Sequence, residues 1–157
     1  MQSHSMASVF LGPDCGQLYR EKGMATTGAE LVTFECVRLV QRFCVLADRA
    51  QGEELTGLFT ADGSFQRGDL TVQGRDAIGR MLSARPADMA TRHLLTTSLI
   101  EPTGPDTATG VHYCLVYVSG AGQDPNTPIM REYQDLYRRT QEGWLIEARV
   151  VLTPFGG

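Results

Sequence analysis

The feature that most constrains the fold is an apolar pattern of helical period between Thr27 and Ala50. Apolar side chains recur there at steps of three and four residues, the spacing that gathers side chains on one face of a helix. The repeating positions are Leu31, Phe34, Val37, Val40, Phe43 or Cys44, and Ala47. Thr27 and Glu30 have the spacing of a capping box, which satisfies free backbone N–H groups where a helix begins. The pattern therefore predicts one long helix over residues 27–50.

Asp48 interrupts this apolar face near the predicted end of the helix. At about 100° per residue, it lies only about 20° around the helix axis from Val37. Burying a lone carboxylate costs about several kcal/mol unless the group is paired or neutralised. Two interpretations follow. Either the helix frays by this point and Asp48 is solvated, or Asp48 has a partner inside the fold.

Length and composition indicate one globular domain. The 157 residues are 42 % hydrophobic and 20 % charged, which is enough apolar material for a substantial core. A net charge of −4 and a pI near 5.3 leave no basic stripe, so we expect no nucleic-acid partner. We also expect no membrane partner, because no apolar run approaches the ~18–20 residues of a membrane span and no signal peptide is recognisable.

Cysteine use indicates a reducing compartment. Cys36 and Cys44 are eight residues apart on the predicted helix, about 12 Å along its axis, which is too far for a disulfide. Cys15 and Cys114 complete the set, and no two cysteines form a C-x-x-C pair. We interpret them as small buried hydrophobic residues of a cytoplasmic protein, without a structural zinc site.

The order of helical and strand patterns along the chain predicts an α+β fold. Residues 1–26 lack periodicity and are interpreted as a flexible extension, in part an expression remnant, ahead of a single domain over residues 27–157. After the long helix we predict a short helix that packs Leu55, Leu58 and Phe59, a turn at 60–63, a hairpin of 64–69 with 70–73, and a helix at 75–84. Period-two patterns then predict strands at 91–101, 107–119, 128–140 and 144–151. Short connections make these four an antiparallel meander, curved over the long helix.

Of the three histidines, His4 lies in the extension and is set aside with it, and the candidate bases are His93, at the start of the first long strand, and His112, in the second. For His93 and His112 the alternative is a hydrogen-bonded core or rim histidine. Period two places His93 on one strand face with Leu95, Thr97 and Leu99.

An Asp and a His that meet in an apolar pocket form a usable catalytic pair. The carboxylate accepts a hydrogen bond from one ring nitrogen, fixes the tautomer and makes the other nitrogen a better base. Such a base can remove a proton next to a carbonyl or a leaving group. Asp48 and His93 are the candidates, because each lies on an inward face without a partner nearby in the sequence.

A second polar group follows on the third and fourth strands of the meander. Arg131, Tyr133, Asp135 and Tyr137 alternate on one strand face, and Arg149 lies on the next strand. An Asp135–Arg149 pair is interpreted as a salt bridge that fixes the strand register. Tyr133 either donates its hydroxyl to a substrate oxygen or is an amphipathic sheet residue.

Five segments in a fixed order resemble a known family. They are GEELTGLFTADG at 52–63, GRDAI at 74–78, TRH at 91–93, YQDLY at 133–137 and GWLIEAR at 143–149. Together with the Asp at the end of the first helix, they resemble the SnoaL-like branch of the nuclear-transport-factor-2-like (NTF2-like) superfamily over about residues 30–153. The resemblance implies a cone-shaped α+β fold, in which a curved, mostly antiparallel sheet wraps around a long N-terminal helix and encloses one apolar pocket.

The same resemblance implies site residues and a range of functions. Relatives include polyketide cyclases, dehydratases, a dehydrochlorinase and ketosteroid isomerase, beside members with no catalysis. In the dehydratase and dehydrochlorinase members a helix-end Asp and a strand His form the catalytic dyad, and Asp48 and His93 occupy those positions. Ketosteroid isomerase uses an Asp base and a Tyr oxyanion donor, and those positions hold Arg67 and Phe43 here, so that mechanism is not available. Related proteins are commonly dimers or trimers, and we expect a homodimer or homotrimer.

From these observations we expect a cofactor-independent acid–base enzyme, a dehydratase-like lyase or isomerase. Its substrate would be a small hydrophobic cyclic or carbonyl compound. His93 would act as general base and then as acid, with Asp48 orienting it. The candidates for substrate binding are Tyr133, Arg131, Arg149, Phe43, Thr97 and Tyr113.

We expect no metal and no cofactor, because the chain has neither a Gly-rich phosphate loop nor a spaced set of His and Cys ligands. An oxyanion donor would have to be Tyr113, Tyr117, Tyr133, Arg131 or water. The alternative function is a non-catalytic small-molecule-binding module or an assembly subunit of the same fold. An open cavity beside a hydrogen-bonded Asp48–His93 pair favours the enzyme, whereas a pocket plugged by apolar side chains favours the module.

Overall fold

The long helix predicted from the apolar pattern is α2, Gly28–Asp48, in a computed structural model that describes residues 27–120 and 122–155. The predicted capping box is present: the Thr27 N–H donates to Glu30 Oε2 at 2.8 Å, and the Glu30 N–H donates to Thr27 Oγ1 at 3.3 Å. These two residues belong to the first of two units, Met1–Leu31 and Val32–Gly157. The predicted extension at 1–26, with His4 and Cys15, lies outside the described residues.

The buried face of α2 is wider than the predicted stripe. Its buried side chains are Cys36, Leu39, Val40, Phe43, Cys44 and Leu46. Val37 and Ala47 of the predicted stripe are partly buried and pack against this core. A wide apolar face is expected of a helix that lies inside the curve of a sheet, because more than one side of it is covered.

A six-stranded sheet provides the rest of the core, with its strands in the order β2-β1-β6-β5-β4-β3. Their bounds are β1 Phe59–Arg67, β2 Leu70–Gln73, β3 Ala90–Pro102, β4 Thr107–Ser119, β5 Ile129–Thr140 and β6 Gly143–Leu152. The predicted hairpin and the four-stranded meander are confirmed, and all these pairs are antiparallel. One pairing, β1 with β6, is parallel and joins the hairpin to the meander.

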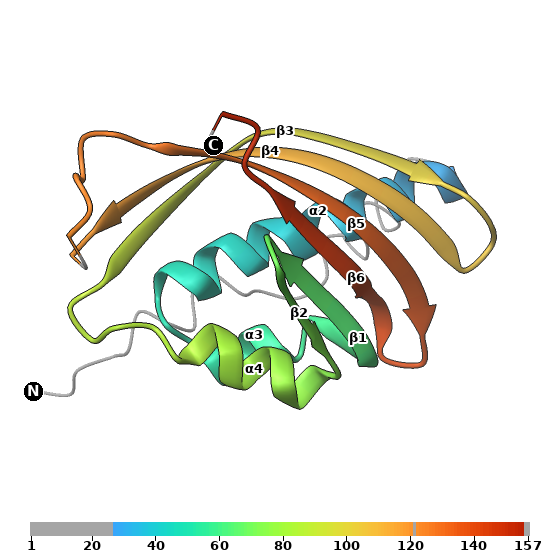
Figure 1. Ribbon diagram of the computed structural model, residues 1–157. Helices are drawn as coiled ribbons and strands as arrows, with labels where there is room; N and C mark the ends of the chain where they lie inside the picture. The colour runs from blue at the N-terminus through green and yellow to red at the C-terminus, as the bar shows by residue number, and fades with distance from the viewer. Residues whose placement is uncertain (1–26, 121, 156–157) are drawn as a thin grey trace, which may run out of the picture. The chain divides into compact units, whose positions relative to one another are not determined.

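The sheet is curved and does not close into a barrel. Figure 1 shows β3 to β6 arching over α2, with α3 (Gly52–Thr56) and α4 (Arg75–Ser83) on the open side beside β1 and β2. This arrangement confirms the predicted α+β fold with a curved, mostly antiparallel sheet around an N-terminal helix. Within the described residues, no helix is long and apolar enough to cross a membrane.

Two predictions about local structure were wrong, both because of irregularities in a strand. The predicted turn at 60–63 lies inside β1, whose register against β6 shifts between Phe59 and Ser64. In β3 a similar shift lies between Leu95 and Thr97. An extra residue reverses the inward and outward alternation. Thr97 and Leu99 are therefore exposed rather than on the face of His93.

Candidate functional site

Asp48, the last residue of α2, is hydrogen-bonded to the start of β3. Asp48 Oδ1 lies 2.6 Å from His93 Nδ1, the His93 backbone N–H donates to Oδ2 at 2.9 Å, and the Thr91 hydroxyl donates to Oδ1 at 2.9 Å. The side chains of His93 and Asp48 are only 10 % and 14 % exposed. Of the two interpretations of Asp48, the structure therefore shows the one with a partner inside the fold.

These contacts keep Asp48 ionised and fix the orientation of the imidazole. Burial would raise the pKa of Asp48, but the hydrogen bonds and charge of His93 and the Thr91 hydroxyl outweigh it and hold the pKa below its ordinary value of 3.8. An ionised carboxylate only accepts hydrogen bonds. His93 Nδ1 therefore carries the proton that faces Asp48, and Nε2 is left as the basic nitrogen.

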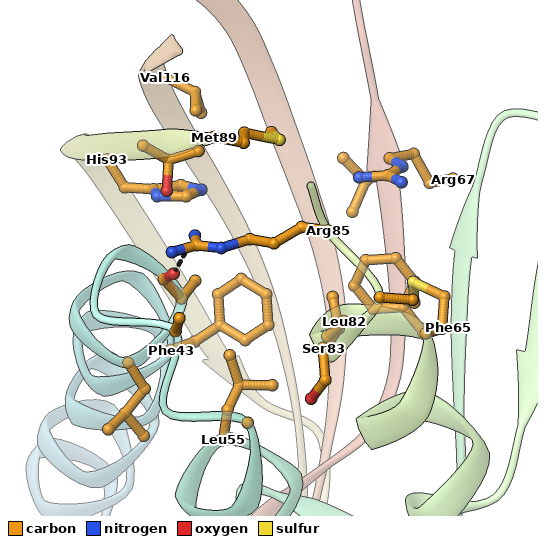
Figure 2. A pocket seen from close by; sticks show the side chains of 18 of the residues that line it. Phe43, Leu55, Phe65, Arg67, Leu82, Ser83, Arg85, Met89, His93 and Val116 are labelled. Atoms are coloured by element: carbon orange, nitrogen blue, oxygen red, sulfur yellow. Dashed lines mark hydrogen bonds between the residues drawn. The ribbon is translucent and has the colours of Figure 1, made fainter. Parts of the chain in front are cut away.

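His93 faces a cavity of about 350 Å³, a volume within the range of small-molecule sites. Figure 2 shows the imidazole at one side of this cavity, above Phe43 and Leu55. Most of the lining is apolar and comes from helices and sheet alike, including Leu46, Phe65, Met81, Leu82, Met89, Val116, Val118, Ile129 and Val151. The pocket is thus open beside the Asp48–His93 pair and is not plugged.

The six predicted substrate-binding residues divide into three groups, of which the last is the buried Arg149. Phe43, Arg131 and Tyr133 line the cavity. Thr97 and Tyr113, the latter 39 % exposed, lie on the outer face of the sheet and do not line it. The neighbours of Tyr113 on β4, His112 and Cys114, are buried. Because successive side chains of a strand point to opposite faces, Tyr113 points outward.

Arg149 is fully buried and packs against side chains that line the cavity. Its Nε and Nη2 donate to the two carboxylate oxygens of Asp135 at 2.7 and 2.6 Å, so the predicted register-fixing salt bridge is present. The guanidinium lies 4.1 Å from the ring centre of Phe43 and 4.6 Å from that of Tyr133. Arg149 therefore positions two lining residues and does not itself line the cavity.

His112 belongs to the same buried cluster. Its Nε2 is 2.8 Å from the Tyr137 hydroxyl, which donates to Asp135 Oδ2 at 2.7 Å. Burial lowers the pKa of His112 to about 4, with the charge of Arg149 acting in the same direction and Asp135 opposing it. His112 is a neutral core histidine and does not line the cavity.

Arg85 lines the cavity but was not predicted from the sequence. It follows α4 in a loop, where no periodic pattern marks a side chain as inward. Its Nη1 donates to the Ala47 carbonyl near the end of α2 at 2.9 Å, and Figure 2 shows the side chain crossing the cavity toward the side of His93. Within the described parts of the chain, no three His, Cys, Asp or Glu side chains are placed to hold a metal ion.

The fold defines the class of protein, and solved structures show the same architecture. An NTF2-like protein with a cystatin-like fold from Novosphingobium aromaticivorans is 25 % identical, with a TM-score of 0.69 and 92 % of each chain covered. A proposed scytalone dehydratase from the same organism is 20 % identical, with a TM-score of 0.70 over 80 % of this chain and 85 % of the other. Rv3472 from Mycobacterium tuberculosis, a protein of unknown function, is 29 % identical, with a TM-score of 0.67 over 78 % and 75 %.

The fold is therefore that of NTF2-like proteins. More particularly, residues 33–150 match the model of the SnoaL-like domain, and the chain belongs to this family. None of the curated proteins matches the chain significantly.

Proposed function

We propose that this protein is a cofactor-independent acid–base enzyme, a dehydratase-like lyase or isomerase that acts on a small hydrophobic cyclic or carbonyl compound. The observation that carries the proposal is the 2.6 Å contact between His93 Nδ1 and Asp48 Oδ1 at the wall of an open, largely apolar cavity. A carboxylate that orients an imidazole beside a substrate-sized space is suited to general acid–base catalysis.

The reaction uses the free nitrogen of His93. Nε2 takes a proton from a carbon next to a carbonyl, and the electrons of that C–H bond form an enolate. In a dehydratase the enolate electrons then form a C=C bond while the bond to a β-hydroxyl breaks. The proton on Nε2 passes to the departing oxygen, which leaves as water. In an isomerase the same proton returns to a different carbon.

A developing enolate oxygen needs a donor. Tyr113 and Tyr117, two of the predicted donors, are on one face of β4, and Val116 and Val118, which line the cavity, are on the other. Burial raises the pKa of Tyr133 well above its ordinary value, so its hydroxyl stays protonated. Arg85 is the better donor, because its guanidinium has five N–H groups and, within the described residues, forms one hydrogen bond, to the Ala47 carbonyl.

The experiment is turnover of an aromatic-fused cyclic β-hydroxy ketone, followed by the absorbance of the enone product. His93→Gln and Asp48→Asn should each lower kcat by roughly several hundred-fold, the loss expected when a general base or its orienting group is removed. Tyr113→Phe is the matched control, because Tyr113 lies outside the cavity, and it should retain wild-type turnover. Near wild-type kcat in either dyad variant would falsify the proposal.

A further inference from the structure

Three guanidinium groups line a cavity in an otherwise acidic protein. Arg67, Arg85 and Arg131 all contribute to its wall, although the whole chain has a net charge of −4. None of the three forms an ion pair with a carboxylate among residues 27–120 and 122–155. No Asp or Glu among the described residues lines the cavity, and Asp48, which lies behind His93, is bonded to His93 and Thr91. The excess charge of the cavity is therefore positive.

The register of the sheet brings Arg67 and Arg131 together at one side of the cavity. Arg67, on β1, pairs with Val151 of β6, and Val151 pairs with Tyr133 of β5. Arg131 is two residues before Tyr133 and so shares its inward face. The two arginines thus flank Val151, and all four of these side chains line the cavity.

Electrostatics indicates that the two cations are close to each other. Burial and the charge of Arg67 both lower the pKa of Arg131, because each makes a further positive charge less favourable. Among the described residues, Arg131 uses one N–H in a side-chain hydrogen bond to the Thr153 hydroxyl, which leaves further donors of its guanidinium for a ligand. An anion between two guanidinium groups would remove their repulsion and accept several charge-assisted hydrogen bonds.

His93 lies on the other side of the same cavity. It is in one row with Val116 of β4 and Ile129 of β5, and Arg131 is the next inward-facing residue after Ile129. Two strand spacings, about 10 Å, therefore separate the β3 and β5 backbones, and Figure 2 shows His93 and Arg67 on opposite sides. An apolar ring system can fill the space between His93 and Arg67.

We propose that the substrate is an organic acid, with an apolar ring body and a carboxylate that Arg67 and Arg131 bind while its reacting carbon lies at His93. This inference rests on the proposed function for the position of the reacting carbon, but not for the binding of the anion. It adds a second recognition element to a largely apolar cavity, and it predicts that neutral analogues bind weakly.

The test is equilibrium binding, measured by calorimetry, of two probes of nearly the same shape, the anionic 2-naphthoate and the neutral 2-naphthamide. Wild type should bind 2-naphthoate at least about tenfold more tightly, the size expected of one charge-assisted hydrogen bond. Arg67→Gln and Arg131→Gln should each remove about that factor for 2-naphthoate and leave 2-naphthamide unchanged. Arg131→Lys, which keeps the charge but not the planar fork, should lose less. Arg139→Gln is the control, since Arg139 is on β5 but outside the cavity.

Equal affinity for the two probes, or a preference for 2-naphthoate that survives both Arg→Gln variants, would overturn the proposal. A preference that is lost in His93→Gln but kept in the arginine variants would also overturn it, because His93 would then be the anion site. Binding needs no turnover, so failure here is separate from failure of the dyad. A dyad without enzymatic activity would leave the 2-naphthoate preference intact.

Discussion

At the scale of single residues, the pairing of Asp48 with His93 explains why a carboxylate lies on the apolar side of a helix. A carboxylate on the apolar side of a helix is unfavourable alone, and here it accepts three hydrogen bonds from β3. The sequence revealed Asp48 as an anomaly on its helix and made His93 its candidate partner, and the family resemblance strengthened this pairing. The sequence could not reveal Arg85, because a side chain in a loop follows no periodic pattern, and it marked Arg67 only as a departure from the site of ketosteroid isomerase.

The lowered pKa of His112 leads to a prediction of how the free energy of unfolding depends on pH. Its pKa in the folded protein, about 4, lies below the ordinary value of 6.5, so the unfolded chain binds a proton first as the pH falls. The contribution of His112 to the free energy of unfolding is complete above about pH 6.5 and is lost between about pH 6.5 and 4, by about 3 kcal/mol in total. In His112→Gln, which cannot titrate, urea denaturation at several pH values should show a correspondingly smaller decline. An equal decline in both proteins would contradict the assignment.

At the scale of elements, local sequence patterns predicted the helices and strands but not the register shifts within the strands. The hairpin, the four-stranded meander and most element boundaries could be predicted from the sequence. Apolar alternation and turn residues involve only residues that are close together in the chain. The shift between Leu95 and Thr97 leaves no such mark, and it moved Thr97 out of the candidate site. The parallel β1–β6 pair joins distant segments, and no local pattern encodes it.

The Asp135–Arg149 pair between β5 and β6 gives an element-scale prediction. Arg149→Met should lower the free energy of unfolding by about 3–5 kcal/mol, because it leaves the Asp135 carboxylate buried without its cation. The double variant Asp135→Leu with Arg149→Met should recover most of that loss, since no unpaired charge remains. Urea denaturation measures both, with Arg139→Gln as an exposed control. A double variant no more stable than the single one would show that the charge is not the cause.

At the scale of the whole molecule, curvature of the sheet separates two faces with different roles. The inner face of residues 32–157 holds the core, the Asp48–His93 pair and the cavity. The outer face of β3, β4 and β5 carries exposed apolar side chains: Leu94, Leu99, Val111, Tyr113 and Leu136. Such a face suits association of copies, and the homodimer or homotrimer expected from the family resemblance stays a prediction.

Hydrogen–deuterium exchange shows whether His93, oriented by Asp48, removes a proton from a carbon acid in the cavity. The probes are 1-tetralone and its 6-carboxylate in D₂O, and NMR follows loss of the proton signals next to the carbonyl. Wild type and Tyr113→Phe should accelerate exchange, whereas His93→Gln and Asp48→Asn should slow the enzymatic rate by about a hundredfold or more. Exchange at the wild-type rate in both dyad variants, or no exchange above the uncatalysed rate while wild type binds a probe, would show that His93 is not the base.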